Sequence, residues 1–247
     1  MTAASFKDRI ALVTGASRGI GAAAAEALAA EGAHIVAVAR TTGALEELDD
    51  RIRTKGGTAT LVPLDLKDYE GIDRLGGALY ERFGRLDILV ANAGILGPLS
   101  PLGHVDPKQW DDVIAINLTA NWRLIRSMDP LLRQSDAGRA IFMSSGAATN
   151  VRAYWGPYTV SKAALDALVR TYAEETRNTH VRANLFNPGP TRTKMRAQAM
   201  PGEDPLTLPT PEEIAARLLP LADASLTETG MIYDAKAGRF LAFQRPA

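Results

Sequence analysis

Short apolar runs alternate with longer amphipathic segments along most of the chain. The short runs are rich in Val, Ile and Leu, which is typical of parallel strands buried on both faces. They lie at residues 10–13, 34–39, 59–62, 86–91, 140–143, 181–186 and 231–233. The longer segments repeat apolar residues at helical spacing over residues 22–31, 45–54, 69–83, 110–132 and 161–177. This order predicts one α/β domain over residues 1–247, with a doubly wound, mainly parallel seven-stranded sheet of the Rossmann type and helices on both faces.

The alternation breaks down over residues 188–211, a segment that contains six prolines. Connections of this length without secondary structure of their own are usually functional. We therefore expect this segment to lie beside a substrate site.

Composition narrows the choice of function. Lys plus Arg and Asp plus Glu each total 28, so no net charge attracts the chain to nucleic acid or to an anionic membrane. The chain has no cysteine and only three scattered histidines, which predicts no metal site and fits a reducing compartment. Residues 1–9 do not resemble a signal peptide, and no apolar stretch is long enough to span a membrane. We expect a cytoplasmic protein without a nucleic-acid or membrane partner.

A glycine-rich turn follows the first predicted strand and opens an alanine-rich helix. Glycines let the backbone approach a pyrophosphate, and the last glycine lets helix and strand pack closely. The amides and dipole of the helix N-terminus favour the phosphate charge. The context predicts a dinucleotide site formed by Gly15, Ser17, Arg18, Gly19, Ile20 and Gly21.

The charge beyond the glycine turn indicates which dinucleotide binds. A strand that binds NAD usually ends in an acidic residue about 20 residues after the glycines. Residues 33–45 contain no acid, and Arg40 follows the second predicted strand. A guanidinium can pair with a 2′-phosphate, and Arg18 adds a second cation. NADP(H) is therefore the preferred cofactor, and NAD(H) is left open.

Tyr158 and Lys162 lie four residues apart in a predicted helix, so their side chains share one face. A tyrosine hydroxyl is a weak acid-base group at neutral pH, and a neighbouring ammonium together with the positively charged oxidised nicotinamide is expected to lower its pKa. Ser144 and Ser145 follow the strand at 140–143, and adjacent residues there point in opposite directions, so one of them is expected to reach a ligand.

Asn117 lies on the apolar stripe of the segment at 110–132. A buried amide needs hydrogen-bond partners, which indicates either a functional or a purely structural network.

Together these motifs resemble the short, single-domain branch of the short-chain dehydrogenase/reductase family, most closely over residues 6–193. The resemblance implies a catalytic tetrad of Asn117, Ser145, Tyr158 and Lys162, and the family's serine-to-tyrosine spacing selects Ser145 over Ser144. In this scheme Tyr158 exchanges a proton with the substrate oxygen, Ser145 positions it, Lys162 binds the nicotinamide ribose, and Asn117 anchors a water. The resemblance also implies cofactor contacts, besides those of Tyr158 and Lys162, from Asp65, Leu66, Asn92, Ala93, Gly94, Pro188, Gly189, Thr191 and Thr193.

The expected function is NADPH-dependent hydride transfer to or from a carbonyl or alcohol, with a 3-oxoacyl thioester or a small ketone as candidate substrates. The alternatives are a non-catalytic NADP-binding module and, with less support, epimerase or dehydratase chemistry on nucleotide sugars. Relatives pair subunits through the helices matching 110–132 and 161–177, so a homodimer or homotetramer is expected. Many relatives end in a glycine-rich segment that this chain lacks at residues 233–238, which weakens the tetramer inference.

Loops after the strands should surround the substrate. Leu96, Leu99 and Trp155 are expected to make that site apolar. Three arginines are candidates for binding an anionic group on the substrate, namely Arg152, Arg192 and Arg196.

Overall fold

The computed structural model describes residues 6–243. Its centre is a sheet of eight strands in the order β3-β2-β1-β4-β5-β6-β7-β8. Strands β1 to β7 are parallel, and β8 pairs antiparallel with β7. The strands are β1 (Ile10–Thr14), β2 (His34–Ala39), β3 (Thr58–Pro63), β4 (Ile88–Ala91), β5 (Arg139–Met143), β6 (Arg182–Asn187), β7 (Ile232–Asp234) and β8 (Arg239–Leu241).

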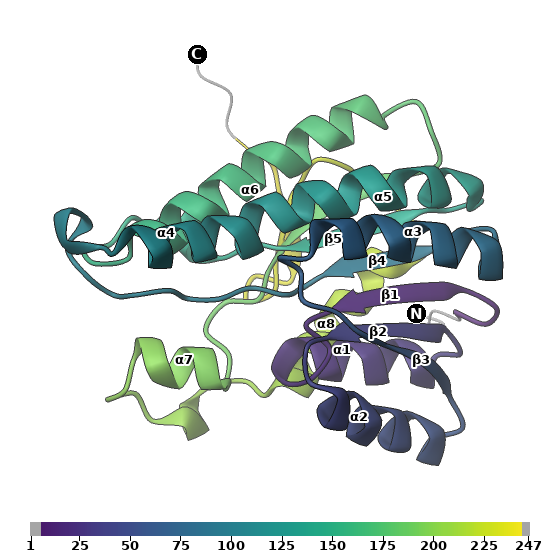
Figure 1. The fold of residues 1–247 in the computed structure, drawn as a ribbon, viewed down its shortest axis with the longest axis horizontal. Helices are drawn as coiled ribbons and strands as arrows, with labels where there is room; N and C mark the ends of the chain where they lie inside the picture. Colours follow the sequence, from purple (N-terminus) through teal and green to yellow (C-terminus); the bar gives the residue numbers. More distant parts are fainter. Residues whose placement is uncertain (1–5, 244–247) are drawn as a thin grey trace.

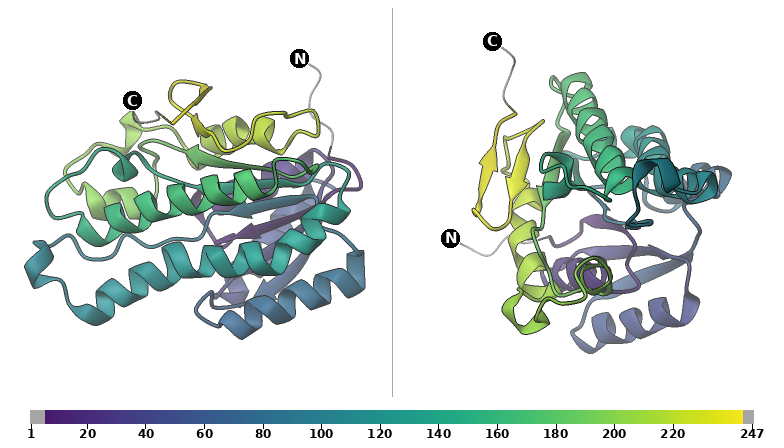
Figure 2. Two further views of the ribbon diagram at one scale, coloured as in Figure 1. Left: turned by 90° about the horizontal axis from the view of Figure 1, so that it is seen from above. Right: turned by 90° about the vertical axis from the view of Figure 1, so that its left-hand side faces the viewer.

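The predicted doubly wound, mainly parallel sheet is confirmed, but the predicted count of seven strands is wrong because β8 is added. This strand is only three residues long and closes a hairpin at the sheet edge, shown in yellow in Figure 2. So short a strand has no extended apolar run, which is why the hydrophobic pattern does not reveal it.

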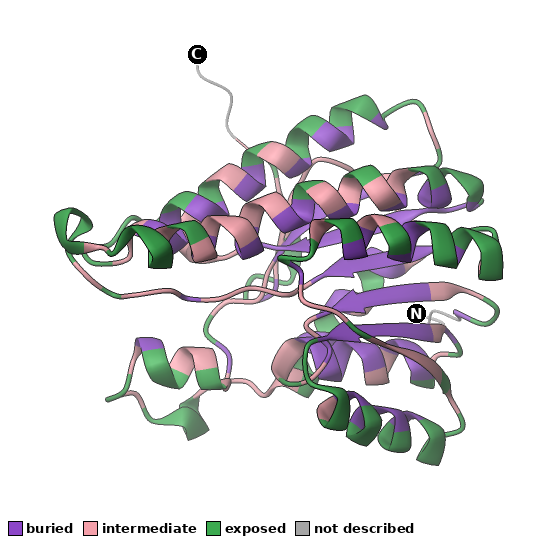
Figure 3. Ribbon diagram, viewed as in Figure 1, coloured by how far each residue is buried: buried purple, intermediate pink, exposed green. Residues whose placement is uncertain are grey.

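Two layers of helices cover the sheet, one on each face (Figure 1). The helices are α1 (Gly19–Ala30), α2 (Thr42–Thr54), α3 (Tyr69–Phe83), α4 (Pro107–Ile114), α5 (Ala120–Gln134), α6 (Gly156–Glu175), α7 (Lys194–Ala199) and α8 (Pro211–Ala222). Side chains of α1, α2 and α8 share one apolar cluster with the sheet, and those of α3, α5 and α6 share the other. Figure 3 shows buried strands between helices that bury one face and expose the other. The continuous apolar runs in the sequence reflect this double cover.

The strand order places the site. Strands β2 and β3 lie on one side of β1, and β4 to β8 lie on the other. The connections that follow β1 and β4 therefore diverge to opposite faces of the sheet, and a doubly wound sheet forms its ligand crevice at this switch point.

The segment predicted as one helix over 110–132 is interrupted. A π-turn, η2 (Ala115–Thr119), separates α4 from α5 and contains Asn117. Such wide turns occur often at functional sites, because the extra residue changes the direction of a side chain.

Residues 188–211 are more regular than a proline-rich connection suggests. They include α7 and a 3-10 turn, η4 (Pro205–Thr207), and α7 stands apart from the helix layers in Figure 1. Helix α8 follows directly, with its N-terminus fixed by a capping box between Thr210 and Glu213. The hydrophobic pattern did not predict α8, although proline is favourable in the first turn of a helix.

Over residues 6–243, no helix has both the length and the apolar character needed to cross a bilayer. Within the same residues, no three metal-ligating side chains are gathered in one place.

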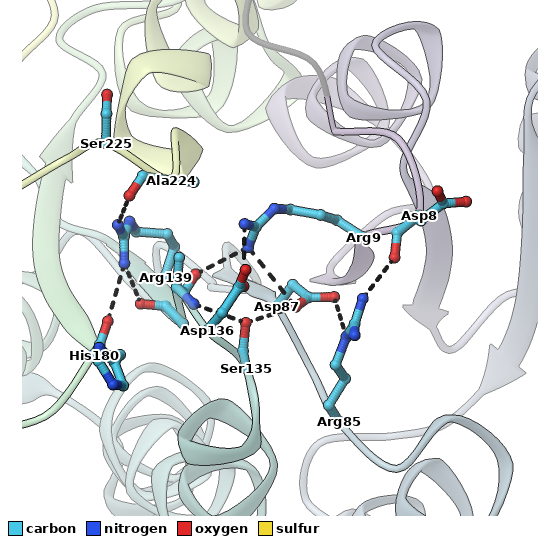
Figure 4. Close-up of polar contacts among 12 residues, drawn as sticks. Asp8, Arg9, Arg85, Asp87, Ser135, Asp136, Arg139, His180, Ala224 and Ser225 are labelled. Atoms are coloured by element: carbon cyan, nitrogen blue, oxygen red, sulfur yellow. Dashed lines mark hydrogen bonds and ion pairs between the residues drawn. The ribbon is translucent and has the colours of Figure 1, made fainter.

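A buried polar network joins loops at the edge where the strands begin (Figure 4). Arg139, only 3% exposed, donates to the carbonyl oxygens of Asp223 at 2.8 Å and His180 at 3.1 Å, and also to Gly138, Ala224 and Leu226. Burial lowers the pKa of Arg139 to about 10. The guanidinium thereby ties the start of β5 to the loops before β6 and after α8.

Asp87 is the acidic centre of the same network and is fully buried. Its carboxylate accepts hydrogen bonds from the Ser135 hydroxyl at 2.6 Å and the Ile10 amide at 2.8 Å, and it pairs with Arg85 at 3.2 Å. The network therefore links the starts of β1, β4 and β5.

Replacing Arg139 by methionine is expected to lower the free energy of unfolding by about 3 kcal/mol, because several buried carbonyl groups lose their donor. Urea unfolding followed by circular dichroism measures the change. Arg74→Met, which removes a guanidinium that is 67% exposed and pairs with an exposed carboxylate, serves as the control and should change stability little. Equal stability of the two variants would show that the carbonyl contacts of Arg139 are unimportant.

Candidate active site

A cleft of about 1120 Å³ lies where the parallel strands end. It brings together residues from the glycine turn, from the loops after β2 to β6, and from α6. The predicted site residues that line it are Gly15, Ser17, Arg18, Gly19, Ile20, Arg40, Asp65, Leu66, Asn92, Ala93, Gly94, Ser145, Tyr158, Lys162, Pro188, Gly189, Thr191 and Thr193. Two predicted residues, Gly21 and Asn117, are not in the lining. Both contact residues that are, Gly21 packing against Gly15 and Asn117 bonding to Ile95.

The glycine turn has the conformation that its sequence predicts. Gly15 has a φ of 66°, and a β-carbon there would lie 2.9 Å from the Cα of Ala93. At Gly21 a β-carbon would collide with the Gly15 carbonyl and the Asn92 amide. Gly15 therefore allows a left-handed turn, and Gly21 allows α1 to pack against the loop after β4.

Thr14 and Asn92 connect this turn to β4. The Thr14 hydroxyl accepts hydrogen bonds from the amides of Asn92 at 3.0 Å and Ala93 at 3.1 Å. The Asn92 side chain donates to the Thr14 carbonyl at 3.0 Å. These bonds hold the two loops on either side of the switch point at a fixed distance.

The start of α1 can accommodate an anion. Arg18 is the N-cap residue and makes no side-chain capping bond, and the first turn of α1 contains no acid. Its first amides therefore keep their donors available for a phosphate. Among residues 6–243, neither Arg18 nor Arg40 pairs with a carboxylate, although both line the cleft. The exposed backbone donors and free guanidinium groups fit a dinucleotide with an additional phosphate.

The other part of the cleft is formed where α6 meets the end of β5. Tyr158 is 8% exposed, and the Ser145 hydroxyl lies near enough to its hydroxyl to lower the pKa of the phenol. The Lys162 ammonium donates to the Met143 carbonyl at 2.6 Å and lies 5.8 Å from the centre of the Tyr158 ring. The structure thus brings three of the four predicted catalytic residues, Ser145, Tyr158 and Lys162, together in the lining of one cleft.

Among the protein's own groups, burial and not the neighbouring ammonium dominates the pKa of Tyr158. Burial raises the pKa of Tyr158, and the Ser145 hydroxyl opposes this increase only in part. Burial also lowers the pKa of Lys162 to about 8, which Asp166 partly counteracts. Tyr158 therefore keeps its proton at neutral pH, and Lys162 remains mainly an ammonium.

Asn117 is fully buried behind Lys162 and uses its whole amide group. Its oxygen accepts from the Ile95 amide at 2.9 Å, and its nitrogen donates to the Ile95 carbonyl at 2.9 Å and to the Ser161 hydroxyl at 3.0 Å. The side chain joins the π-turn to the loop after β4 and to α6. It therefore positions the site rather than presenting its amide group to the cleft.

The substrate end of the cleft has an apolar wall. Leu96, Tyr158 and Ala199 form a buried cluster, with Trp155 and Met195 packed against it. The predicted apolar contribution of Leu96 and Trp155 agrees with this arrangement. Leu99 is 39% exposed and lies outside this cluster.

All three arginines expected near the substrate line the cleft, and two of them also have protein partners. Arg192 donates to the carbonyl oxygens of Pro205 at 2.8 Å and Leu208 at 3.2 Å, and Arg196 pairs with Glu203 through a hydrogen bond of 2.6 Å. Both side chains fold the segment around α7 onto itself. Arg152 lines the cleft and has no carboxylate partner among residues 6–243.

Sequence reasoning missed Asp166 and the role of Ser144. Ser144 is 1% exposed and donates to the Asp166 carboxylate at 2.6 Å. Asp166 follows Lys162 by one helical turn, so the spacing of Tyr158, Lys162 and Asp166 along one face was available as a signal.

The model of the short chain dehydrogenase family matches residues 9–204. The chain belongs to the short-chain dehydrogenase family. Its members are oxidoreductases that act on alcohol and carbonyl groups, so the predicted family and enzyme class are confirmed.

Individual relatives of this dehydrogenase resemble it over most of its length. It is 39% identical to the uncharacterized oxidoreductase YciK of Escherichia coli K12, over 95% of this chain and 94% of YciK. It is 32% identical to the 3-oxoacyl-[acyl-carrier-protein] reductase FabG of Salmonella typhimurium, over 77% of each chain. A short chain dehydrogenase of Shigella flexneri complexed with NADP superimposes with a TM-score of 0.88 at 38% identity, covering 93% of this chain and 98% of that one.

Gly21→Ala is expected to destabilise the dehydrogenase by about 2 kcal/mol, because the new methyl group would press against the Gly15 backbone. Gly77→Ala is the matched control, since Gly77 lies in α3 with no atom near a β-carbon. It should raise stability by about 0.5–1 kcal/mol. Thermal unfolding of both variants checks the pair, and a neutral Gly21→Ala would contradict the packing role.

Proposed function

We propose that this dehydrogenase is an NADPH-dependent reductase of carbonyl groups, working within a single domain. The observation that carries the proposal is the contact of Tyr158, Ser145 and Lys162 in the same cleft as the glycine turn. A proton donor, a hydroxyl that can bind a carbonyl oxygen and a cation thus lie beside a dinucleotide-shaped site.

The cleft has the features that NADPH needs. The glycine turn and the first amides of α1 would hold the pyrophosphate, and the predicted residues Asp65, Leu66, Asn92, Ala93 and Gly94 would line the adenosine and ribose. Arg18 and Arg40 would hold the 2′-phosphate. The Shigella relative complexed with NADP supports this assignment. Bound NADPH would supply the hydride.

Tyr158 is proposed as the proton donor. Burial keeps its hydroxyl protonated at neutral pH, so the proton is in place before the carbonyl oxygen develops negative charge. Ser145 would donate a hydrogen bond to the same oxygen and hold it beside the phenol. Reprotonation of Tyr158 after each turnover restores the acid.

Lys162 and Asn117 are proposed to support this proton transfer. The Lys162 ammonium would bind the nicotinamide ribose and stabilise the phenolate that remains after Tyr158 gives up its proton. Asn117 fixes the Ile95 backbone opposite this ammonium, and a water held there would continue the relay. Pro188, Gly189, Thr191 and Thr193 would close the nicotinamide end.

The proposed substrate is an apolar ketone or a 3-oxoacyl thioester. The apolar wall of Leu96, Trp155 and Met195 supports an aliphatic or aromatic group next to the carbonyl. FabG, a reductase of 3-oxoacyl thioesters on acyl carrier protein, supports the second choice.

A homodimer or homotetramer is proposed through α5 and α6. Trp122 on α5 is 44% exposed and Val160 on α6 is 42% exposed. These apolar side chains on neighbouring helices would be covered by the same helices of a second copy.

Tyr158→Phe is expected to reduce kcat for carbonyl reduction by at least about a hundredfold, because the substrate oxygen loses its proton donor. NADPH oxidation with a panel of ketones, aldehydes and 3-oxoacyl thioesters measures the loss. Tyr154→Phe removes the hydroxyl of a tyrosine that is 60% exposed and lies four residues earlier, and it should keep activity within about twofold. Unchanged kcat in Tyr158→Phe on a substrate of the wild type would refute the proposed chemistry.

Arg40→Ala is expected to weaken NADPH binding by about tenfold or more and to leave NADH binding nearly unchanged. The reason is that only NADPH carries the phosphate that this guanidinium would pair with. Fluorescence titration with each cofactor gives both dissociation constants. Arg152→Ala, which removes a cation from the opposite end of the cleft, should leave the cofactor preference intact. An equal loss for both cofactors in Arg40→Ala would argue against 2′-phosphate recognition.

A further inference from the structure

Three side chains of α6, each one turn after the last, contact three consecutive residues at the end of β5. Lys162 bonds to the Met143 carbonyl and Asp166 to the Ser144 hydroxyl, while the Tyr158 hydroxyl lies beside Ser145. The first two contacts belong to the proposed chemistry. Asp166 is 5% exposed and does not line the cleft, so a role in binding substrate is not available to it.

A buried carboxyl group in a mostly apolar layer needs a compensating interaction. Around it lie Leu165 and Val169, both fully buried in the cluster between α6 and the sheet. A structural hydrogen bond to Ser144 alone would be served equally by a neutral amide. The carboxylate adds a negative charge one helical turn from Lys162, the cation of the proposed active site.

We propose that Asp166 is a positioning residue that keeps Lys162 in its ammonium form and, through Ser144, fixes the backbone that carries Ser145. The hydroxyl of Ser144 donates to the carboxylate, and the Lys162 ammonium donates to the residue before Ser144. Charge and geometry are thus controlled by one side chain. This inference rests on the proposed role of Lys162 in binding the cofactor ribose.

The charged groups around Asp166 are consistent with this role. Burial raises the pKa of Asp166 to about 6, while Ser144, Lys162 and Arg170 oppose the increase. Burial lowers the pKa of Lys162 to about 8, and the negative charge of Asp166 opposes this decrease. Between these two values the carboxylate and the ammonium coexist. Removing the carboxylate would lower the pKa of Lys162 further and bring its deprotonation toward neutral pH.

The test uses Asp166→Asn, which retains an acceptor for Ser144 and removes the charge. The dissociation constant for NADPH is measured by fluorescence from pH 6 to 9.5. In the wild type, affinity should fall as pH rises past the pKa of Lys162, and in Asp166→Asn this fall should begin about one pH unit lower. At pH 6.5 the two proteins should bind NADPH within about twofold of each other, because Lys162 is charged in both.

Two control variants separate charge from structure. Ser144→Ala removes the hydrogen bond but leaves a carboxylate that is ionised at alkaline pH, so the fall in affinity should stay at the wild-type pH. Asp129→Asn removes another carboxylate bonded to α6, through the Tyr172 hydroxyl at 2.8 Å, and should also leave that pH unchanged. If all three variants shift the fall equally, or if Asp166→Asn does not shift it, the inference is overturned.

If Asp166→Asn fails to fold, Ser144→Ala still tests the proposal. Loss of the hydrogen bond should raise the pKa of Asp166 above its value of about 6, which carboxyl-carbon NMR of labelled aspartate can follow. Absence of an aspartate whose titration responds to Ser144→Ala would overturn the inference. These measurements require only NADPH binding or titration, so they are independent of carbonyl turnover. If the protein binds NADPH with this pH dependence but reduces no carbonyl, the proposed function is refuted and the inference about Asp166 stands.

Discussion

The contact between α6 and the end of β5 is the interaction on which the active site depends. Side chains on one face of a helix are three or four residues apart, whereas the residues at a strand end are consecutive. Few arrangements of a helix and a strand therefore let each side chain of the helix face contact a different residue of the strand end. Here Tyr158, Lys162 and Asp166 meet three successive residues, Met143 to Ser145, at the end of a strand that is buried along its whole length. The groups proposed for proton transfer therefore share one rigid joint between a helix and the central sheet.

Buried polar groups have different roles at the two ends of the parallel strands. Where the strands begin, Arg139 and Asp87 form hydrogen bonds with other groups of the protein, and these bonds join loops that are distant in sequence. At the opposite end, Lys162 and Tyr158 are buried but face a cleft. Polar groups at the first end stabilise the fold. Those at the second end retain donors and protons that a cofactor and substrate can use.

The loops around the cleft divide into fixed and variable parts. Asn117, placed by the π-helical turn, bonds the backbone of Ile95 and thereby fixes a loop that lines the cleft. By contrast, the segment around α7 is held mainly by its own contacts, from Arg192 to nearby carbonyls and from Arg196 to Glu203. A segment that carries its own internal bonds can change in sequence without disturbing the sheet, which suits it to selecting the substrate.

The sequence by itself determined the doubly wound sheet, the glycine turn and the family, because these features depend on local periodicity and on short motifs. It also marked the residues that line the cleft, since the carboxyl ends of parallel strands must meet at one edge. Only the tertiary structure decided which polar groups pair. It separated Ser144 from Ser145, engaged Arg192 and Arg196 with the protein, raised the pKa of Tyr158, and brought Asp166 into the site. Burial and hydrogen bonding depend on contacts between distant segments, and no local pattern encodes them.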